Sequence, residues 1–122
     1  MNILILDDDQ DRHIGFNTAL IPQGHKLTSV YTAKECIEKL TNNNYDMVLL
    51  DHDLGGEVYV DSGLNTGWEV AKWLYDNPDK KPERVIIHSY NPVGAHNMKN
   101  LIEGSITVPY YLLLRDIHKY TL

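Results

Sequence analysis

The sequence predicts an α/β fold in which five strands and five helices alternate as a (βα)5 three-layer sandwich. Short apolar runs such as residues 3–6 and 47–50 are typical of strands buried on both faces of a parallel sheet. Amphipathic segments of helical length separate these runs along the chain. Right-handed crossovers place helices on both faces of such a sheet, and the expected strand order is the flavodoxin-like 2-1-3-4-5.

The first half of the chain alternates between strand and helix signals. Its expected elements are a strand at 3–6, a helix ending near residue 20, a strand at 26–31, a helix at 33–41 and a strand at 47–50. The second of these strands alternates polar and apolar side chains and is expected nearer an edge of the sheet. Pro22 and Gly24 break the first helix. Thr32 and Glu35 form a capping box that begins the second helix.

The second half continues this alternation after a long loop. Its expected elements are a loop at 55–66, a helix at 67–76, a strand at 85–87, a helix from 92 to about 103, a strand at 106–108 and a short helix at 110–118. Val70, Ala71 and Leu74 form the apolar face of the first of these helices. Asn91 followed by Pro92 is typical of a helix start, and a glycine at 104 is expected to end that helix.

Composition limits the classes of function. The 122 residues suit one compact domain, and we expect residues 1–122 to form it. A formal net charge of −6 disfavours a protein that coats double-stranded DNA, but it allows a small nucleotide or an RNA end as partner. The apolar runs are too short for a membrane span. A single cysteine and an N-terminus without a basic region predict a cytoplasmic protein without disulfides or a Cys-based zinc site.

Polar side chains follow three of the predicted strands. These side chains are Asp7 and Asp8 after the first strand, Asp51, His52 and Asp53 after the third, and His88, Ser89 and Asn91 after the fourth. In an open α/β sheet the ligand site lies at the carboxyl ends of the strands, near the point where the strand order reverses. Strands one, three and four are neighbours in the order 2-1-3-4-5, so we expect these side chains to converge.

Four of these residues are candidate metal ligands: Asp7, Asp8, Asp51 and Asp53. Carboxylates that share a small space repel one another unless protons or a cation intervene. Oxygen ligands with open positions suit Mg²⁺ or Mn²⁺. The alternative for the acids after the first strand is that they only complement the N-terminal dipole of the following helix.

Two histidines are candidate general acids or bases. His52 and His88 both follow strands whose ends carry the site, and imidazole titrates near neutral pH. The alternative for His88 is a buried strand-end histidine whose hydrogen bonds are purely structural. Asp51 is included among the catalytic candidates because a carboxylate at this position can also act as a nucleophile.

Four further residues are candidates for binding the substrate phosphate. Arg12 can clamp phosphate oxygens with its planar fork, or it can pair with the neighbouring acids. Ser89 and the helix start at Asn91 place a hydroxyl and free amides together, which suits an anion. Asn97 lies one to two turns into that helix and is either within reach of the site or at the surface. The loop at 55–66 is either a binding element beside the site or a plain surface excursion.

Several runs resemble the receiver domains of response regulators, and the resemblance covers nearly the whole chain. Residues 3–9, ILILDDD, are similar to the first receiver strand with its acidic metal-binding pair. Residues 47–51, MVLLD, are similar to the third strand, whose last residue is the phospho-accepting aspartate. Residues 67–71, GWEVA, resemble the start of the third receiver helix, and Ser89 stands where receivers carry a Ser or Thr after strand four.

Two other runs, residues 51–56 (DHDLGG) and 88–95 (HSYNPVGA), resemble instead the divergent cyclic-phosphate processing receiver family. This resemblance implies action on cyclic phosphates at nucleotide or nucleic-acid termini. The loop after the predicted third strand is longer than in ordinary receivers. Val108-Pro109 stands where those receivers carry a Lys-Pro pair, whose lysine contacts the phosphoryl group.

The leading hypothesis is therefore a metal-dependent phosphoesterase of the receiver fold that processes cyclic phosphates on nucleotides or RNA ends. Asp8 and Asp51 would hold Mg²⁺ or Mn²⁺, with Asp7 and Asp53 supporting them directly or through water. In a covalent variant, Asp51 would be the nucleophile and form an aspartyl-phosphate. The missing lysine disfavours that variant.

Two alternatives stay open at this point. In the first, the chain is an atypical signalling receiver in which Asp51 accepts phosphate from a histidine kinase and a partner protein reads the signal. Val108 in place of the lysine disfavours ordinary switching. In the second, the same pocket sequesters a cyclic nucleotide without cleaving it.

Overall fold

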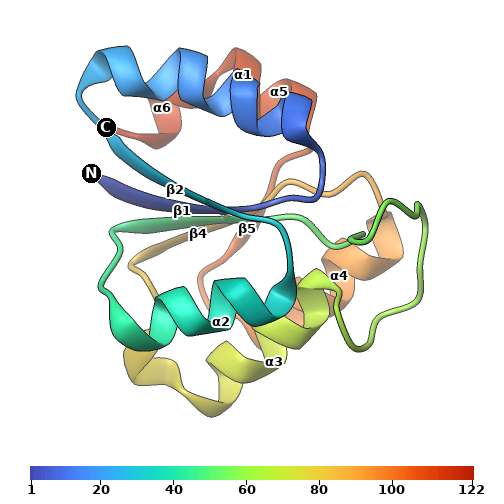
Figure 1. Cartoon of the computed structure of the whole chain (residues 1–122). Coiled ribbons are helices and arrows are strands. Elements are labelled where there is room, and N and C mark those ends of the chain that lie inside the picture. The colour runs from blue at the N-terminus through green and yellow to red at the C-terminus, as the bar shows by residue number, and fades with distance from the viewer.

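The computed structural model describes residues 1–122 and contains a five-stranded parallel sheet with helices on both faces (Figure 1). The strands are β1 (Asn2–Leu6), β2 (Lys26–Val30), β3 (Met47–Leu50), β4 (Arg84–Ile87) and β5 (Ile106–Thr107). Their order is β2-β1-β3-β4-β5, and every neighbouring pair is parallel. The predicted flavodoxin-like strand order is therefore confirmed.

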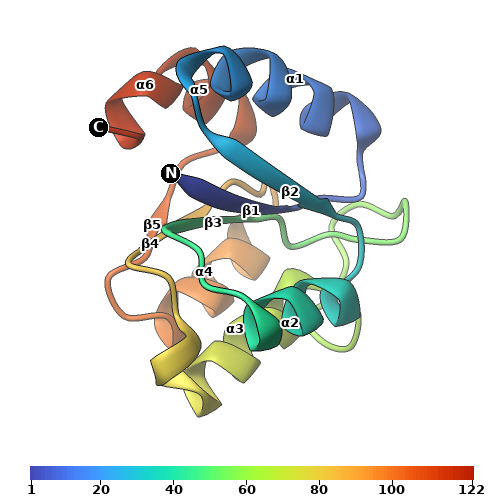
Figure 2. The same ribbon diagram turned by 60° about the vertical axis from the view of Figure 1, so that its left-hand side comes forward.

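Helices cover the sheet in two layers. The helices are α1 (Gln10–Leu20), α2 (Ala33–Asn42), α3 (Gly67–Asp76), α4 (Pro92–Leu101), α5 (Tyr110–Arg115) and α6 (Ile117–Tyr120), with short 3-10 turns η1 (Ile21–Gln23) and η2 (Pro78–Lys80). Helices α1, α5 and α6 lie on one face of the sheet, and α2, α3 and α4 lie on the other (Figures 1 and 2). None of the helices combines the length and the apolar character that crossing a membrane requires.

The interior strand β1 shows why the sheet needs both layers. Successive side chains of a strand point to opposite faces. Ile3 and Ile5 pack in the apolar cluster under α1 and α5, whereas Leu4 and Leu6 pack in the cluster under α2, α3 and α4. All four side chains are fully buried, as expected for a strand in the middle of a parallel sheet.

Side-chain caps begin the helices where the sequence predicts them. The Thr32 hydroxyl accepts a hydrogen bond from the Glu35 N–H at 3.2 Å, and the Glu35 carboxylate reaches back to the Tyr31 N–H at 3.4 Å. The Asn91 side chain accepts from the Gly94 N–H at 2.9 Å at the start of α4. The bonds from the Glu35 and Gly94 N–H groups satisfy backbone donors that the first helical turn leaves free, and the bond from the Tyr31 N–H ties down the residue before the cap.

The predicted last helix, at 110–118, is wrong as a single element. It is two short helices that meet at Asp116, whose backbone (φ −112°, ψ 21°) departs from helical values. Aspartate is a weak helix former, and here its carboxylate instead binds the Arg115 guanidinium at 2.9 Å. Helix α4 also ends at Leu101, before the predicted end near 103, and Gly104 takes a positive φ of 79° in the turn that follows.

The carboxyl ends of β1, β3 and β4 lie side by side at one edge of the sheet. The long segment 55–66 leaves β3 at this edge and passes near the start of α4 before it enters α3 (the green loop in Figure 1). The fold therefore places the polar strand ends and this loop together.

Candidate functional site

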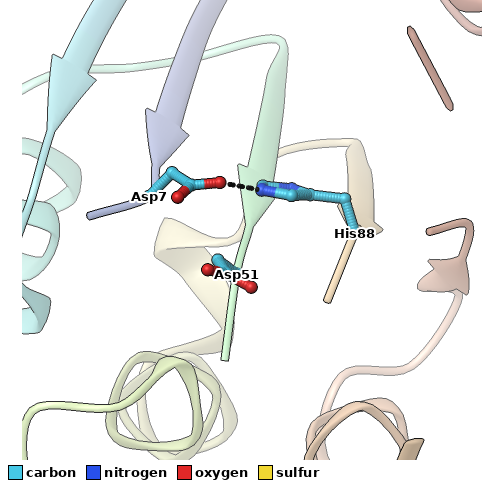
Figure 3. Close-up of side chains that lie close together, drawn as sticks. All are labelled: Asp7, Asp51 and His88. Atoms are coloured by element: carbon cyan, nitrogen blue, oxygen red, sulfur yellow. Dashed lines mark hydrogen bonds and ion pairs between the residues drawn. The ribbon is translucent and has the colours of Figure 1, made fainter. Parts of the chain in front are cut away.

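Three buried side chains meet at the carboxyl edge of the sheet. Asp7 follows β1, Asp51 follows β3 and His88 follows β4 (Figure 3). The ladder continues one residue beyond the strands, because the Asp51 N–H donates to the Leu6 carbonyl and the His88 N–H to the Leu50 carbonyl. The ligand atoms of the three side chains lie within 4.8 Å of one another.

Asp7 is held from several sides. Nε2 of His88 lies 2.8 Å from Asp7 Oδ2, which is a hydrogen-bonding distance. Nδ1 of His88 is buried without a hydrogen-bond partner. The Asp9 N–H donates to Asp7 Oδ1 at 2.9 Å, and His13 Nε2 lies 2.8 Å from the Asp7 carbonyl oxygen. This network fixes the direction in which the Asp7 carboxylate points.

Arg12 supplies the positive charge of the site. Its Nη1 lies 3.4 Å from Asp7 Oδ2 and 3.3 Å from Asp51 Oδ2, so a single nitrogen bridges the two carboxylates. The guanidinium also lies 5.6 Å from the ring centroid of Tyr90 and 5.5 Å from that of Tyr110. Partial burial lowers the pKa of Arg12, but the charges of Asp7 and Asp51 outweigh this and raise it.

The two bridged carboxylates differ in their affinity for protons. Burial raises the pKa of Asp51 from 3.8 to about 6, and the charge of Asp7 adds to the rise while those of His88 and Arg12 oppose it. Burial also acts to raise the pKa of Asp7, but the hydrogen bond and charge of His88 outweigh it and hold that pKa below its usual value. Asp51 is therefore the group of the pair that takes up a proton first as the pH falls.

A cleft of about 540 Å³ opens beside Asp51, whereas Asp7 and His88 are fully buried and do not line it. It is lined by Asp8, Asp9, Arg12, Asp51, Asp53, Gly56, Glu57, Val58, Tyr59, Ser89 and Tyr90. Two of the acids hold the 55–66 loop against the cleft, because Asp8 Oδ2 accepts from the Gly56 N–H and Asp53 Oδ2 from the Tyr59 N–H, each at 2.6 Å. Of the predicted site residues, the structure brings Asp8, Arg12, Asp51, Asp53 and Ser89 together in the lining.

His52 does not line this cleft. Its ring is fully buried, with Nδ1 2.8 Å from Asp53 Oδ1 and Nε2 2.9 Å from Ser62 Oγ. Gly94 of α4 lies against the ring, where a larger residue would overlap it. The predicted acid–base candidate His52 therefore connects two segments of the chain and holds Asp53 in place. Its hydrogen bond, with those of Asn91 and the Tyr59 N–H, outweighs the effect of burial and lowers the pKa of Asp53.

Asn91 and Asn97 both bind the chain that follows β3. Asn91 Nδ2 donates to Asp53 Oδ1 at 3.0 Å and to the Val60 carbonyl at 3.1 Å, and its N–H donates to Ser89 Oγ at 3.0 Å. Asn97 Nδ2 donates to Ser62 Oγ at 3.0 Å and does not line the cleft. The two predicted substrate-binding amides are thus occupied in holding the loop.

Three contributors to the site were not predicted from the sequence. Ser62 joins His52 to Asn97, and no local signal distinguishes it from other loop serines. Tyr59, in the 55–66 loop, and Tyr90, between β4 and α4, both line the cleft. Tyr90 stands between two residues that were singled out, Ser89 and Asn91, and this position was the available signal.

The site contains a group of side chains that could hold a metal ion. It offers two carboxylates and an imidazole with ligand atoms within 4.8 Å, and further carboxylates line the cleft beside them.

Residues 2–104 match the family described as the cyclic-phosphate processing receiver domain. The chain belongs to this family. A search of curated proteins finds no match.

Solved structures similar to this cyclic-phosphate processing receiver domain are receivers of response regulators. The response regulator TrrA from Thermotoga maritima, in complex with Mg²⁺-BeF, has a TM-score of 0.72 at 21% identity, over 99% of this chain and 98% of that one. A two-component response regulator from Clostridium difficile has a TM-score of 0.77 at 20% identity, over 99% and 92%. A CheY-like receiver domain from Methanospirillum hungatei has a TM-score of 0.68 at 21% identity, over 97% and 90%. Identities this low establish a common fold and nothing further.

Proposed function

We propose that this chain is a metal-dependent phosphoesterase that opens cyclic phosphates on nucleotides or RNA ends. The observation that carries the proposal is the convergence of Asp7, Asp51 and His88, because Asp51 also lines a cleft together with Arg12 and Ser89. Membership of the cyclic-phosphate processing receiver family supports the same class of substrate.

The donor set fits a divalent cation. Carboxylates that share a small space are stabilised by a positive charge between them, and carboxylate oxygens suit Mg²⁺ or Mn²⁺. Asp51 and Asp8, which line the cleft, would hold the cation. Asp53, which also lines it, and Asp7, whose ligand atom lies within 4.8 Å of that of Asp51, would support them directly or through water. A cation there would polarise a phosphoryl oxygen and lower the pKa of a water molecule. The similar TrrA structure contains Mg²⁺.

Two side chains of the cleft are placed to bind the phosphate. The guanidinium of Arg12 has a planar fork of donors that matches two phosphate oxygens. The hydroxyl of Ser89 lines the same cleft and can donate a hydrogen bond while its oxygen accepts from the Asn91 N–H. Asn91 has no free side-chain donor for this purpose, so we assign it to the support of the loop.

His88 is the acid–base group that we propose. Like His52, it is fully buried and does not line the cleft. Its Nε2 lies 2.8 Å from Asp7 Oδ2, and one of its ring nitrogens lies within 4.8 Å of the ligand atom of Asp51, which does line the cleft, whereas the nitrogens of His52 face Asp53 and Ser62. In the reaction, water adds to phosphorus and one of the two ring P–O bonds breaks. The proton that the water loses ends on the alkoxide that leaves, so the product is a phosphomonoester with one free hydroxyl. The Asp7–His88 pair would hold that proton in transit.

The test uses the purified chain with adenosine 2′,3′-cyclic phosphate and either Mg²⁺ or Mn²⁺. We expect a phosphomonoester to form, as read by ³¹P NMR, and we expect Asp51→Asn to reduce its rate by at least about 100-fold. Asp79→Asn, at an exposed position in η2, is the matched control and should leave the rate unchanged. Equal rates for the parent and Asp51→Asn would remove Asp51 from the mechanism.

Incubation with a small phosphodonor and recovery of the cyclic nucleotide separate the two alternatives from the esterase. Asp51 lines the cleft at the end of β3 in a receiver fold, which also suits phosphate acceptance. A stable aspartyl-phosphate on Asp51 after incubation with a small phosphodonor, without turnover of cyclic phosphates, would favour a signalling receiver. Recovery of the cyclic nucleotide intact after long incubation with metal would favour sequestration.

A further inference from the structure

Three large apolar side chains gather at the mouth of the cleft. Val58 is 76% exposed, Tyr59 is 70% exposed and Tyr90 is 45% exposed, and all three line the same cavity as Asp51 and Arg12. Single exposed apolar residues are common on protein surfaces, but a group of them at one opening indicates contact with an apolar ligand or partner. Neither the metal nor the phosphate of the proposed reaction makes use of them.

Tyr59 is held in place through its backbone. The Tyr59 N–H donates to Asp53 Oδ2 at 2.6 Å, and Asp53 is itself held by His52 and Asn91. Tyr59 has a φ of 53°, in the left-handed region that non-glycine residues rarely adopt. Backbone in that region is kept only where its surroundings demand it. The contacts that support the acidic site thus also set the position of Tyr59.

Tyr90 is anchored by its hydroxyl. Its Oη accepts a hydrogen bond from the Tyr111 N–H at 2.7 Å, at the start of α5. The guanidinium of Arg12 lies 5.6 Å from the ring centroid, a distance at which a cation and an aromatic face attract one another. An aromatic ring therefore lies directly beside the group that we assign to the phosphate.

We infer that Tyr59 and Tyr90 form a stacking site for the base of a nucleoside cyclic monophosphate. This inference rests on the proposed function, because it takes the phosphate to lie at Arg12 and Ser89. A cavity of about 540 Å³ has the size of sites for ligands such as a nucleotide. Aromatic side chains that flank an anion site can stack on any base, since every base has a π-face.

The charge of the cleft selects a mononucleotide over an RNA end. Its lining holds the acids Asp8, Asp9, Asp51, Asp53 and Glu57, and one basic residue, Arg12. A chain with further phosphates would bring more negative charge to this rim, where no second cationic side chain meets it. A ligand with a single phosphate and one base can place its base at the two tyrosines and its phosphate at Arg12.

The test compares two ligands by equilibrium binding in the presence of Mn²⁺. One is adenosine 2′,3′-cyclic phosphate, and the other is methyl riboside 2,3-cyclic phosphate, which has no base. We expect the nucleotide to bind at least about tenfold more tightly, and Tyr59→Ala to remove most of this advantage while leaving the base-free ligand unaffected. Tyr59→Phe, which keeps the ring, should keep the advantage. Tyr75→Ala, at an exposed tyrosine on α3, is the matched control.

Three results would overturn the stacking site: equal affinities of the two ligands, equal weakening of both by Tyr59→Ala, or loss of the advantage in Tyr59→Phe. A trinucleotide with a terminal cyclic phosphate that binds more tightly than the mononucleotide would overturn the choice of a mononucleotide. The mass of the recovered ligand separates this inference from the proposed function. A base-dependent affinity with intact ligand supports the stacking site and contradicts the esterase. Hydrolysis of both ligands, bound with equal affinity, supports the esterase and contradicts the stacking site.

Discussion

Nη1 of Arg12 lies 3.3 Å from Oδ2 of Asp51. The same nitrogen lies 3.4 Å from Oδ2 of Asp7, so one cationic group occupies the space between the two buried carboxylates. A divalent cation that uses both carboxylates would need this same space. In the proposed function, the guanidinium and the metal would therefore compete for this space, and a displaced guanidinium would become free to bind the substrate phosphate.

Arg12→Gln should increase the affinity of the chain for Mn²⁺. The substitution removes the charge that neutralises Asp7 and Asp51, so the carboxylates repel one another until a metal binds. We expect a dissociation constant about tenfold lower than that of the parent, as measured by calorimetry without any substrate. Arg115→Gln, at an exposed position away from the cleft, is the control that changes the net charge equally. Unchanged or weaker binding by Arg12→Gln would show that the guanidinium and the metal occupy different positions.

Asp51→Asn should stabilise the metal-free chain at neutral pH. The pKa of Asp51 is raised from 3.8 to about 6 in the folded state, chiefly by burial, so ionisation of this group opposes folding. Well below the ordinary pKa of 3.8 the carboxyl is protonated in both states and the substitution should have little effect. Between pH 4 and 6 the parent loses stability relative to the variant, and above pH 7 the difference should reach about 3 kcal/mol.

Denaturant unfolding in EDTA at a series of pH values measures this difference. The groups that face Asp51 are Asp7 after β1, Arg12 on α1 and His88 after β4, and the substitution changes none of them. The pH dependence of the difference between the parent and Asp51→Asn therefore reports the removal of this one carboxyl from the group. A difference in the free energy of unfolding that does not change between pH 4 and pH 8 would contradict the raised pKa.

The fold and the strand-end residues follow from local signals in the sequence. Apolar runs locate the strands, and general topology rules then bring the ends of neighbouring strands to one edge of the sheet. Asp7, Asp51 and His88 each directly follow such a run, which is why pattern alone places them together.

The direction of the other side chains does not follow from that pattern. His52 comes directly after Asp51, yet its ring turns away from the cleft towards α4, where Gly94 leaves room for it. Asn97 bonds to a serine of the loop rather than reaching into the cleft. These contacts join segments far apart in the chain, and turn and loop residues carry no periodicity that would reveal them.

Gly94→Ala should destabilise the chain through the His52 ring. A methyl group at this position would overlap the buried imidazole, which is held on both sides by Asp53 and Ser62 and has little freedom to move. Overpacking of this kind costs about 1–3 kcal/mol. Gly63→Ala is the control, since nothing lies within 4 Å of a methyl group there.

A double-mutant cycle tests the assignment of that strain. His52→Ala removes the ring, so Gly94→Ala should cost much less in the His52→Ala background than in the parent. The measurement is the free energy of unfolding of the four proteins. Additive effects of the two substitutions would mean that the cost of Gly94→Ala arises elsewhere in α4.

Asn91→Asp should release the 55–66 loop while it keeps the cap of α4. The new carboxylate can still accept from the Gly94 N–H, as the amide does now at 2.9 Å. It cannot donate to Asp53 and to the Val60 carbonyl, and it places a second negative charge beside Asp53. We expect amide exchange in the loop to become about tenfold faster, with exchange in α4 unchanged.

Asn91→Ala is the contrasting variant, because it loses both roles and should also lower stability by about 1 kcal/mol. If exchange in the loop were the same in the parent and in Asn91→Asp, the bonds of Asn91 to the loop would contribute nothing to its order, and the anchoring of Tyr59 through Asp53 would have to come from His52 alone.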